Sequence, residues 1–145
     1  MGLPYQLPQH AAPVPGIGDE PFFDAARQGR LLFKFCDDCQ QPHYYPRALC
    51  PHCMSDKTQW REASGNGEIY TFSLTRRAGP VPYAIAYVTL DEGVTLMTNI
   101  VDCDLESIRI GQRVRLVYKP TDGDIPIACF APIDADRAPT QEPQP

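Results

Sequence analysis

Four cysteines between positions 36 and 53 constrain the fold of this chain more than any other feature. They form two Cys-x-x-Cys pairs, Cys36 with Cys39 and Cys50 with Cys53, and ten residues separate the pairs. Two residues between paired cysteines let both thiolates of a tight turn face one ion, and two such turns supply four sulfurs at tetrahedral corners. The spacing therefore predicts a metal site. It also predicts that metal binding and folding of this segment are one equilibrium.

The same cysteines admit three other interpretations, namely disulfides, a redox dithiol and an iron centre. No secretory signal is recognisable, which argues against disulfides formed in an oxidising compartment. A redox pair opens a helix, whereas Pro42, Pro46 and Pro51 surround these pairs and exclude long helices. Four thiolates bind iron as well as zinc, so the ligands alone leave both metals open. We expect one zinc ion per chain, with iron as the less favoured alternative.

Two histidines and two further cysteines complete the inventory of soft ligands in the body of the chain. His43 and His52 lie inside the metal segment, but with four cysteines already in place we expect both to be surface imidazoles. Cys103 and Cys129 stand alone in apolar stretches, and no base lies beside either of them in the sequence. We therefore expect both to be buried small hydrophobic side chains rather than catalytic thiols.

Length, composition and charge bound the class of protein. A chain of 145 residues with 43% hydrophobic residues fits one globular domain with a small appendage. No apolar run approaches the roughly 18 residues of a membrane span, so we expect a soluble, cytoplasmic protein without a membrane partner. The net charge is −5, with a local +2 over residues 30–77 and a local −5 over residues 78–145. This balance argues against nucleic acid as a partner and is compatible with one small anionic ligand near the metal segment.

The N-terminal part of the chain divides into an arm and a helix. Residues 1–18 form a proline-rich arm, which we expect to be extended and mobile unless a partner holds it. Residues 19–30 carry helix signals: Asp19 can cap the N-terminus, Pro21 suits the first turn, and Gly29 can end the helix.

The remainder predicts a mainly β fold, in which a small ribbon is followed by a barrel. Residues 31–63 form the ribbon, with short strands at 31–35 and 60–62, and this unit is too small to fold without its metal. In residues 64–132 hydrophobic and polar residues alternate with a period of two. The first strand alternates Tyr70, Phe72 and Leu74 with polar residues. The other four strands are expected at 83–90, 94–101, 113–119 and 126–130. Five strands favour an OB-type barrel over a sandwich of about seven strands. Residues 133–145 are expected to be a disordered tail.

A helix, a rubredoxin-like four-cysteine zinc ribbon and a five-stranded OB-fold barrel, in this order, resemble the DUF35 family of acyl-CoA-associated proteins. The match covers roughly residues 20–132. Its residues are Phe22-Phe23, Gly29-Arg-Leu31, Cys36-x-x-Cys39, Pro46-Arg47, Cys50-Pro-x-Cys53, Trp60, Gly65-x-Gly67-x-Ile-Tyr-Thr-Phe72, Pro82-Tyr83, Ala86-x-Val88, Ile110-Gly-x-x-Val114 and Phe130. One departure is Gln40, where a glycine commonly follows the first cysteine pair. Gln40 is therefore expected to strain or reshape that turn without removing a ligand.

The resemblance implies a non-catalytic subunit of an acyl-CoA-processing complex that helps to assemble the complex and to shape the CoA entrance. The implied partner is a thiolase-like acyltransferase, or alternatively an enoyl-CoA hydratase, which carries the catalytic residues. The sequence agrees, because it contains no Ser-His-Asp grouping, no phosphate-binding glycine loop and no carboxylate cluster. An OB protein that binds single-stranded nucleic acid and an iron electron carrier remain the alternatives from other classes.

CoA has anionic phosphates and a flat adenine, so cationic and aromatic residues are its candidate contacts. The candidates for contact with CoA or the partner are Phe22, Phe23, Arg47, Trp60, Arg76 and Arg77. Further candidates of the same kinds are Tyr44, Tyr45, Lys57 and Arg61. The plainer interpretation is that the arginines are solvated and the aromatic rings cover the ribbon. The adjacent Arg76 and Arg77 are the pair to test first, because they follow a strand and precede the flexible residues 78–80.

Overall fold

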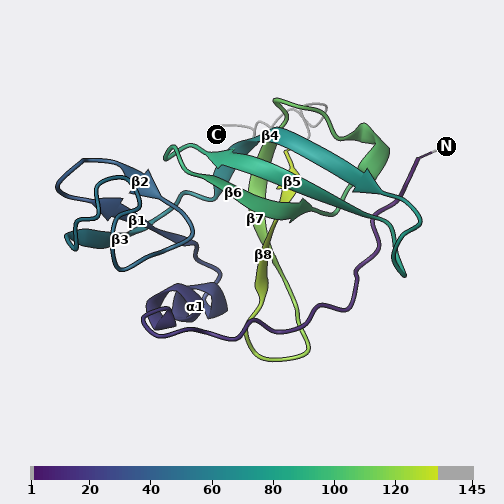
Figure 1. Ribbon diagram of the computed structural model, residues 1–145. Helices are drawn as coiled ribbons and strands as arrows, with labels where there is room; N and C mark the ends of the chain where they lie inside the picture. The colour runs from purple at the N-terminus through teal and green to yellow at the C-terminus, as the bar shows by residue number, and fades with distance from the viewer. Residues whose placement is uncertain (1, 134–145) are drawn as a thin grey trace, which may run out of the picture.

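A computed structural model describes residues 2–133 and confirms a mainly β fold with one helix, a small ribbon sheet and a closed barrel (Figure 1). The helix α1 spans Glu20–Arg27. The ribbon sheet has the order β2-β1-β3, with β1 at Leu32–Cys36, β2 at Pro42–His43 and β3 at Thr58–Glu62. No helix in the described range is long and apolar enough to cross a membrane.

The barrel follows the ribbon and closes in the order β4-β5-β6-β8-β7. Its strands are β4 (Asn66–Thr75), β5 (Tyr83–Leu90), β6 (Thr95–Ile100), β7 (Arg113–Lys119) and β8 (Ile127–Pro132), with a short 3₁₀ helix η1 (Leu105–Ser107) between β6 and β7. All neighbours pair antiparallel except β6 and β8, which are parallel. The five predicted strands are therefore present, with ends shifted by only a few residues.

The helix begins and ends close to the positions that the sequence predicts. Gly29 has φ of +76°, and the N–H of Arg30 reaches back to the carbonyl of Ala25 at 2.8 Å, which is a glycine-ended helix terminus. Asp19 is the N-cap residue, as predicted, but its side chain makes no capping hydrogen bond. Its carboxylate instead accepts the N–H of Gly16 at 3.0 Å, so it orders the segment that leads into the helix.

A bulge changes the predicted alternation in β4. Pairing with β5 shifts register between Ile69 and Thr71, so Tyr70 is an extra residue on this strand. Ile69 is buried in the core, whereas Tyr70 points outward with 67% of its surface exposed. Phe72 and Leu74 pack against the core as the alternation predicts. The sequence period could not reveal the bulge because no glycine or proline marks it.

Hydrophobic residues fill the barrel interior and also form a small cluster on its outer surface. Phe130 and Ile100 are fully buried in the main core and lie opposite each other across β6 and β8. Their neighbours Val101 and Cys129 belong to a second cluster, since successive strand residues face opposite sides of a sheet. Tyr5 from the N-terminal arm packs against this second cluster.

The N-terminal arm differs from the expectation of a free segment, because the rest of the chain holds it. The N–H of Leu3 donates to the carboxylate of Asp104 at 2.7 Å, and its carbonyl accepts the N–H of Leu105 at 2.8 Å. The N–H of Tyr5 donates to the carbonyl of Cys103 at 3.2 Å, and the carbonyl of His10 accepts the N–H of Asp122 at 2.9 Å. The arm runs along the barrel to the side away from α1 (Figure 1). Apart from residue 133, the tail expected at 133–145 lies outside the described residues.

Candidate functional site

The two Cys-x-x-Cys turns have the same backbone geometry. The N–H of Gln40 donates to the carbonyl of Cys36 at 2.9 Å, and the N–H of Met54 donates to the carbonyl of Cys50 at 2.8 Å. Gln40 and Met54 occupy equivalent positions with φ of +59° and +66°. Such left-handed backbone costs a side-chain-bearing residue about 1–2 kcal/mol. The turn therefore keeps the conformation expected of glycine at Gln40, and Met54 is a second such position that the sequence analysis missed.

The four cysteine sulfurs lie together and fit a tetrahedral metal ion. All four Sγ atoms are within 4.8 Å of one another, with 3.6 Å between Cys36 and Cys53 and 3.7 Å between Cys39 and Cys50. A tetrahedron with zinc–sulfur bonds of about 2.3 Å has sulfur–sulfur edges of about 3.8 Å. A disulfide has a sulfur–sulfur distance of only about 2.05 Å. The donor set therefore matches a metal centre and not a pair of disulfides.

The four thiols differ in how readily they ionise. The backbone N–H of Cys39 is the main cause that lowers the pKa of Cys36 to about 7. Burial is the main cause that raises the pKa of Cys39 to about 12. One thiol of the cluster therefore ionises readily while its neighbour does not. Four thiolates at this separation require a positive ion among them, and a bound metal deprotonates its thiol ligands.

The two histidines of the ribbon differ from each other. The prediction of a surface imidazole is wrong for His43, which is only 4% exposed and whose Nε2 accepts the N–H of Arg47 at 3.2 Å. Burial lowers the pKa of His43, which favours the neutral ring that this acceptor role needs. His52 is exposed, as predicted. His43 thus fixes the backbone at Arg47, a role that becomes apparent only when β2 is paired with β1.

The ribbon brings two of the candidate contact residues together in one cavity. Arg47 and Trp60 line a hollow of about 310 Å³ between the ribbon sheet and the segment before α1. Lys34 also lines it, pairs with Trp60 across β1 and β3, and places its Nζ 4.6 Å from the centre of the indole ring. Asp19 contributes one carboxylate to the rim. We call this hollow the ribbon pocket; it presents two cations beside an aromatic face.

Phe22 and Phe23 are brought near the ribbon but are buried. They are 8% and 6% exposed, and their ring centres are 5.1 Å apart. Phe22 also contacts Tyr44 and Tyr45 of the ribbon at 6.0 and 5.4 Å between ring centres. These rings fasten α1 to the ribbon, which leaves little of either phenylalanine for contact with a ligand.

Arg76 and Arg77 lie far from the ribbon pocket. β4 begins beside the ribbon and carries its C-terminal end to the opposite end of the barrel (Figure 1). The guanidinium of Arg76 forms two hydrogen bonds of 3.0 Å to the carboxylate of Glu106. Arg77 is exposed and makes no ion pair with any described residue. The six candidates therefore fall into three groups, namely the ribbon pocket, the helix packing and the far end of β4.

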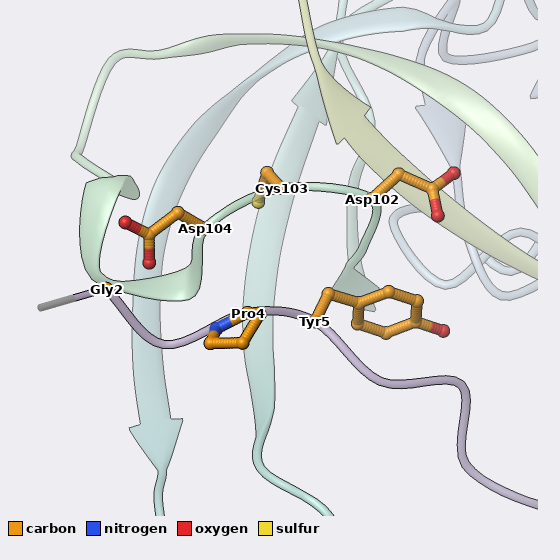
Figure 2. Close-up of a pocket in the computed structure, with 6 residues that line it drawn as sticks. All are labelled: Gly2, Pro4, Tyr5, Asp102, Cys103 and Asp104. Carbon is orange, nitrogen blue, oxygen red and sulfur yellow. The ribbon is translucent and has the colours of Figure 1, made fainter.

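A second open hollow of about 680 Å³ lies where the arm meets the loop after β6. Figure 2 shows Pro4 and Tyr5 of the arm beneath Asp102, Cys103 and Asp104. Both carboxylates already have partners. Asp104 accepts a hydrogen bond from the N–H of Leu3 at 2.7 Å, and Asp102 accepts one from the ammonium of Lys119 at 2.6 Å. The sequence does not reveal this hollow, because no motif in it shows that the arm lies against the barrel.

Two family models match consecutive parts of the chain. The rubredoxin-like zinc ribbon domain of ChsH2 matches residues 23–59, and the C-terminal OB-fold domain of ChsH2 matches residues 60–119. These matches agree with the sulfur geometry and with the closed barrel. They support a metal site of the zinc-ribbon type.

Among characterised relatives, a probable enoyl-CoA hydratase alpha subunit from Thermomonospora curvata is 35% identical over 133 residues. The match covers 88% of this chain and 42% of that protein, so this chain spans less than half the length of that relative. A DUF35 domain-containing scaffold protein from Methanocaldococcus jannaschii is 36% identical over 98 residues, which cover 61% of this chain and 69% of the relative.

Solved structures share the same architecture. A chain of the Ltp2-ChsH2(DUF35) aldolase superposes with a TM-score of 0.71 at 32% identity, covering 83% of this chain and 98% of that chain. A DUF35 protein of unknown function from Sulfolobus solfataricus superposes with a TM-score of 0.61 at 14% identity and covers 81% and 87% of the two chains, which shows the fold alone. Together with the scaffold-protein relative and the ribbon and OB-fold matches, these similarities show that the chain belongs to the DUF35 family.

Proposed function

We propose that this chain is a non-catalytic subunit of an acyl-CoA-processing complex, in which it docks on a thiolase-like partner and completes the CoA entrance. The names of its relatives support the complex, since they include a scaffold protein, a hydratase subunit and a two-component aldolase. The observation in this chain that carries the proposal is a barrel face with exposed aromatic and aliphatic side chains and a single charged residue.

This face, which we call the docking face, is the outer side of β4, β5 and β6. Tyr70, Tyr87 and Met97 are 67%, 45% and 63% exposed, and Ile85 is 38% exposed. Tyr87 and Met97 lie opposite each other on neighbouring strands, so their side chains form one continuous surface. Glu68 is the only charged residue of the three strands.

The composition of the docking face is that of an interface centre, where aromatic residues and methionine are enriched and charges are depleted. The strand β7 contrasts with it, because Arg113, Arg115 and Lys119 make that strand a charged one. The partner for the docking face is therefore a folded protein with an apolar surface of its own, and we assign this role to the large subunit.

The ribbon pocket is the part of this chain that we propose to contact CoA. Lys34 and Arg47 attract the phosphates, and Trp60, which holds the ammonium of Lys34 against its ring, lines the hollow beside them. Contact of Arg76 or Arg77 with CoA stays a prediction, since these residues lie at the far end of β4. The metal in the four-cysteine site is proposed to be one structural zinc per chain, and a colourless protein with one zinc distinguishes it from iron.

Native mass spectrometry of the tagged protein purified from its host tests the subunit role. We expect a hetero-oligomer with a thiolase-like chain and one zinc per copy of this protein. An enoyl-CoA hydratase chain in place of the thiolase-like chain would select the alternative partner. A zinc-bound monomer or self-dimer without another chain contradicts the proposal. Retention on single-stranded DNA at moderate salt would favour the nucleic-acid alternative instead. Cytoplasmic localisation stays a prediction.

Two surface variants test the docking face. Met97→Lys places a charge in the centre of the face and should release the partner while the isolated chain keeps its fold. Arg115→Glu is the matched control, because it changes an exposed position on β7, outside the face. Loss of the partner in both variants, or in neither, removes the docking face from the proposal.

Two variants that each replace one arginine by glutamine test the ribbon pocket. Arg47→Gln should weaken binding of CoA to the assembled complex about tenfold, as expected for loss of a charge-assisted hydrogen bond. Binding of pantetheine, which lacks the nucleotide, should not change. Arg109→Gln removes an exposed arginine that neither lines the pocket nor is among the candidate contacts, and it serves as the control. Equal CoA affinity in the Arg47→Gln complex and the wild type excludes the pocket, while partner capture would still support the subunit role.

A further inference from the structure

The four cysteines of the metal centre differ in their access to solvent. Cys36 and Cys50, which begin the two turns, are fully buried. Cys39 is half-buried, whereas Cys53 is exposed. A tetrahedral site treats its four sulfurs alike, so this difference comes from the chain around the site. Cys53 is therefore the corner of the centre that a small molecule in solution reaches most easily.

The residues around each pair of cysteines account for this asymmetry. Gln40 and Met54 hold the equivalent left-handed positions after the two pairs. The side chain of Gln40 bends back over its own turn, where Nε2 donates to the carbonyl of Asp37 at 2.6 Å. Met54 instead extends into solvent with 68% of its surface exposed, and Pro51 and His52 of the same turn are exposed as well. The second turn thus projects into solvent.

A second sulfur lies within reach of the exposed one. The Sγ atoms of Cys53 and Cys36 are 3.6 Å apart, although the two residues belong to different turns. A bound metal keeps all of its cysteine ligands as thiolates, and the thiolate is the form that reacts with oxidants. Access to solvent, rather than ionisation, therefore decides which ligand reacts in the metal-loaded centre. An accessible thiolate beside a second thiolate is the arrangement typical of redox-sensing cysteines.

We propose that Cys53 is a redox modification site, at which hydrogen peroxide opens the four-cysteine centre. The Cys53 thiolate attacks one oxygen of the peroxide, the O–O bond breaks, and a Cys53 sulfenic acid and a hydroxide ion form. The Cys36 thiolate then attacks the Cys53 sulfur and displaces a second hydroxide ion, which leaves a disulfide between the two residues. The two sulfurs together lose two electrons, and the peroxide gains both. Only Cys39 and Cys50 then remain as ligands.

Oxidation at this one sulfur changes a larger part of the molecule. The ribbon is too small to stay folded without its metal, so loss of two ligands unfolds it. Lys34, Arg47 and Trp60 all belong to the ribbon segment, and the ribbon pocket disappears with it. The barrel has its own closed set of strands and keeps the docking face. Reactivity of Cys53 itself requires neither the partner subunit nor CoA.

Treatment of the full-length, zinc-loaded chain with hydrogen peroxide tests this proposal. Dimedone in the reaction traps sulfenic acids, a zinc-sensitive dye follows release of the metal, and tandem mass spectrometry separates the adduct on Cys53 from that on Cys50. We expect zinc release that rises with peroxide, and several-fold more dimedone on Cys53 than on each of the other three ligands. Without dimedone, the expected product is the disulfide between Cys36 and Cys53.

Two controls separate access from intrinsic reactivity. Removal of the metal with a chelator before the peroxide opens the ribbon, and the adduct should then spread evenly over the four cysteines. Met54→Leu removes the exposed thioether beside Cys53 and should release zinc like the wild type; retention of zinc in this variant would assign the oxidation to the methionine and overturn the proposal. Adduct found mainly on Cys39, or spread evenly in the zinc-loaded chain, would overturn it as well.

Discussion

Replacing Cys50 by serine should unfold the ribbon and α1 while the barrel keeps its fold. Cys50 is fully buried, and its sulfur lies 3.7 Å from that of Cys39 at one edge of the tetrahedron. A serine hydroxyl is a poor zinc ligand, so the site would keep only three of its four ligands. Structural zinc contributes about 10–16 kcal/mol of apparent binding energy in isolated fingers. A whole domain has a free energy of unfolding of only about 5–15 kcal/mol, so the small ribbon should not stay folded without the metal.

Unfolding of the ribbon should extend to α1 but not to the barrel. Phe22 holds the helix by its contacts with Tyr44 and Tyr45 of the ribbon, and these contacts disappear when the ribbon unfolds. The barrel has its own closed set of strands around the fully buried Phe130. We therefore expect the boundary between the unfolded and folded parts near Ala63.

Two-dimensional NMR with metal analysis of the same sample measures this outcome. Amide signals of residues 20–62 should collapse to the narrow dispersion of an unfolded chain, those of residues 66–132 should stay dispersed, and zinc should fall well below one per chain. Cys103→Ser is the control, since it changes a cysteine outside the sulfur cluster and should keep the zinc. A Cys50→Ser protein with one zinc per chain and an unchanged ribbon would refute the four-thiolate assignment.

Three further outcomes follow from buried or strained positions. Phe130→Ala should lower the free energy of unfolding by about 3–5 kcal/mol in urea titrations, because it empties the centre of the barrel; a loss below about 1 kcal/mol would contradict that placement. Met54→Gly should raise the free energy of unfolding by up to about 1 kcal/mol, because it relieves the left-handed backbone, and the gain should appear as a higher thermal midpoint; a lower midpoint would show that the Met54 side chain contributes to packing. Cys129 is fully buried with its pKa raised to about 12, so it should resist iodoacetamide at pH 8 in the folded protein. The unfolded chain ionises this thiol near its ordinary pKa of 9.0, so stability should fall as pH rises above that value, and Cys129→Ala should flatten the slope in alkaline melts.

Local patterns account for the features that the sequence predicted well. The gathering of the four cysteine sulfurs follows from spacing, because two residues between cysteines define a turn whatever the rest of the chain does. The strands of the barrel follow from the period of two, which reports the buried side of each strand directly. The end of α1 follows from Gly29, since a left-handed residue there needs no distant partner.

Features that depend on distant contacts escaped the sequence. His43 looks like a surface residue until β2 pairs with β1 and buries it. The bulge at Tyr70 exists only in the pairing of β4 with β5, and it turns a predicted core residue outward.

The sequence by itself determined the four-cysteine metal site, the order of helix, ribbon and barrel, and the family, because each of these rests on short-range spacing. The tertiary structure alone decided which residues share a surface. It brings Arg47 and Trp60 together with Lys34 in the ribbon pocket and places Arg76 at the other end of β4. It also places Tyr5 over a cavity on the outside of the barrel. The physical reason is that a pocket depends on strand register and on the path of the arm across the barrel, which are set by contacts between segments far apart in the chain.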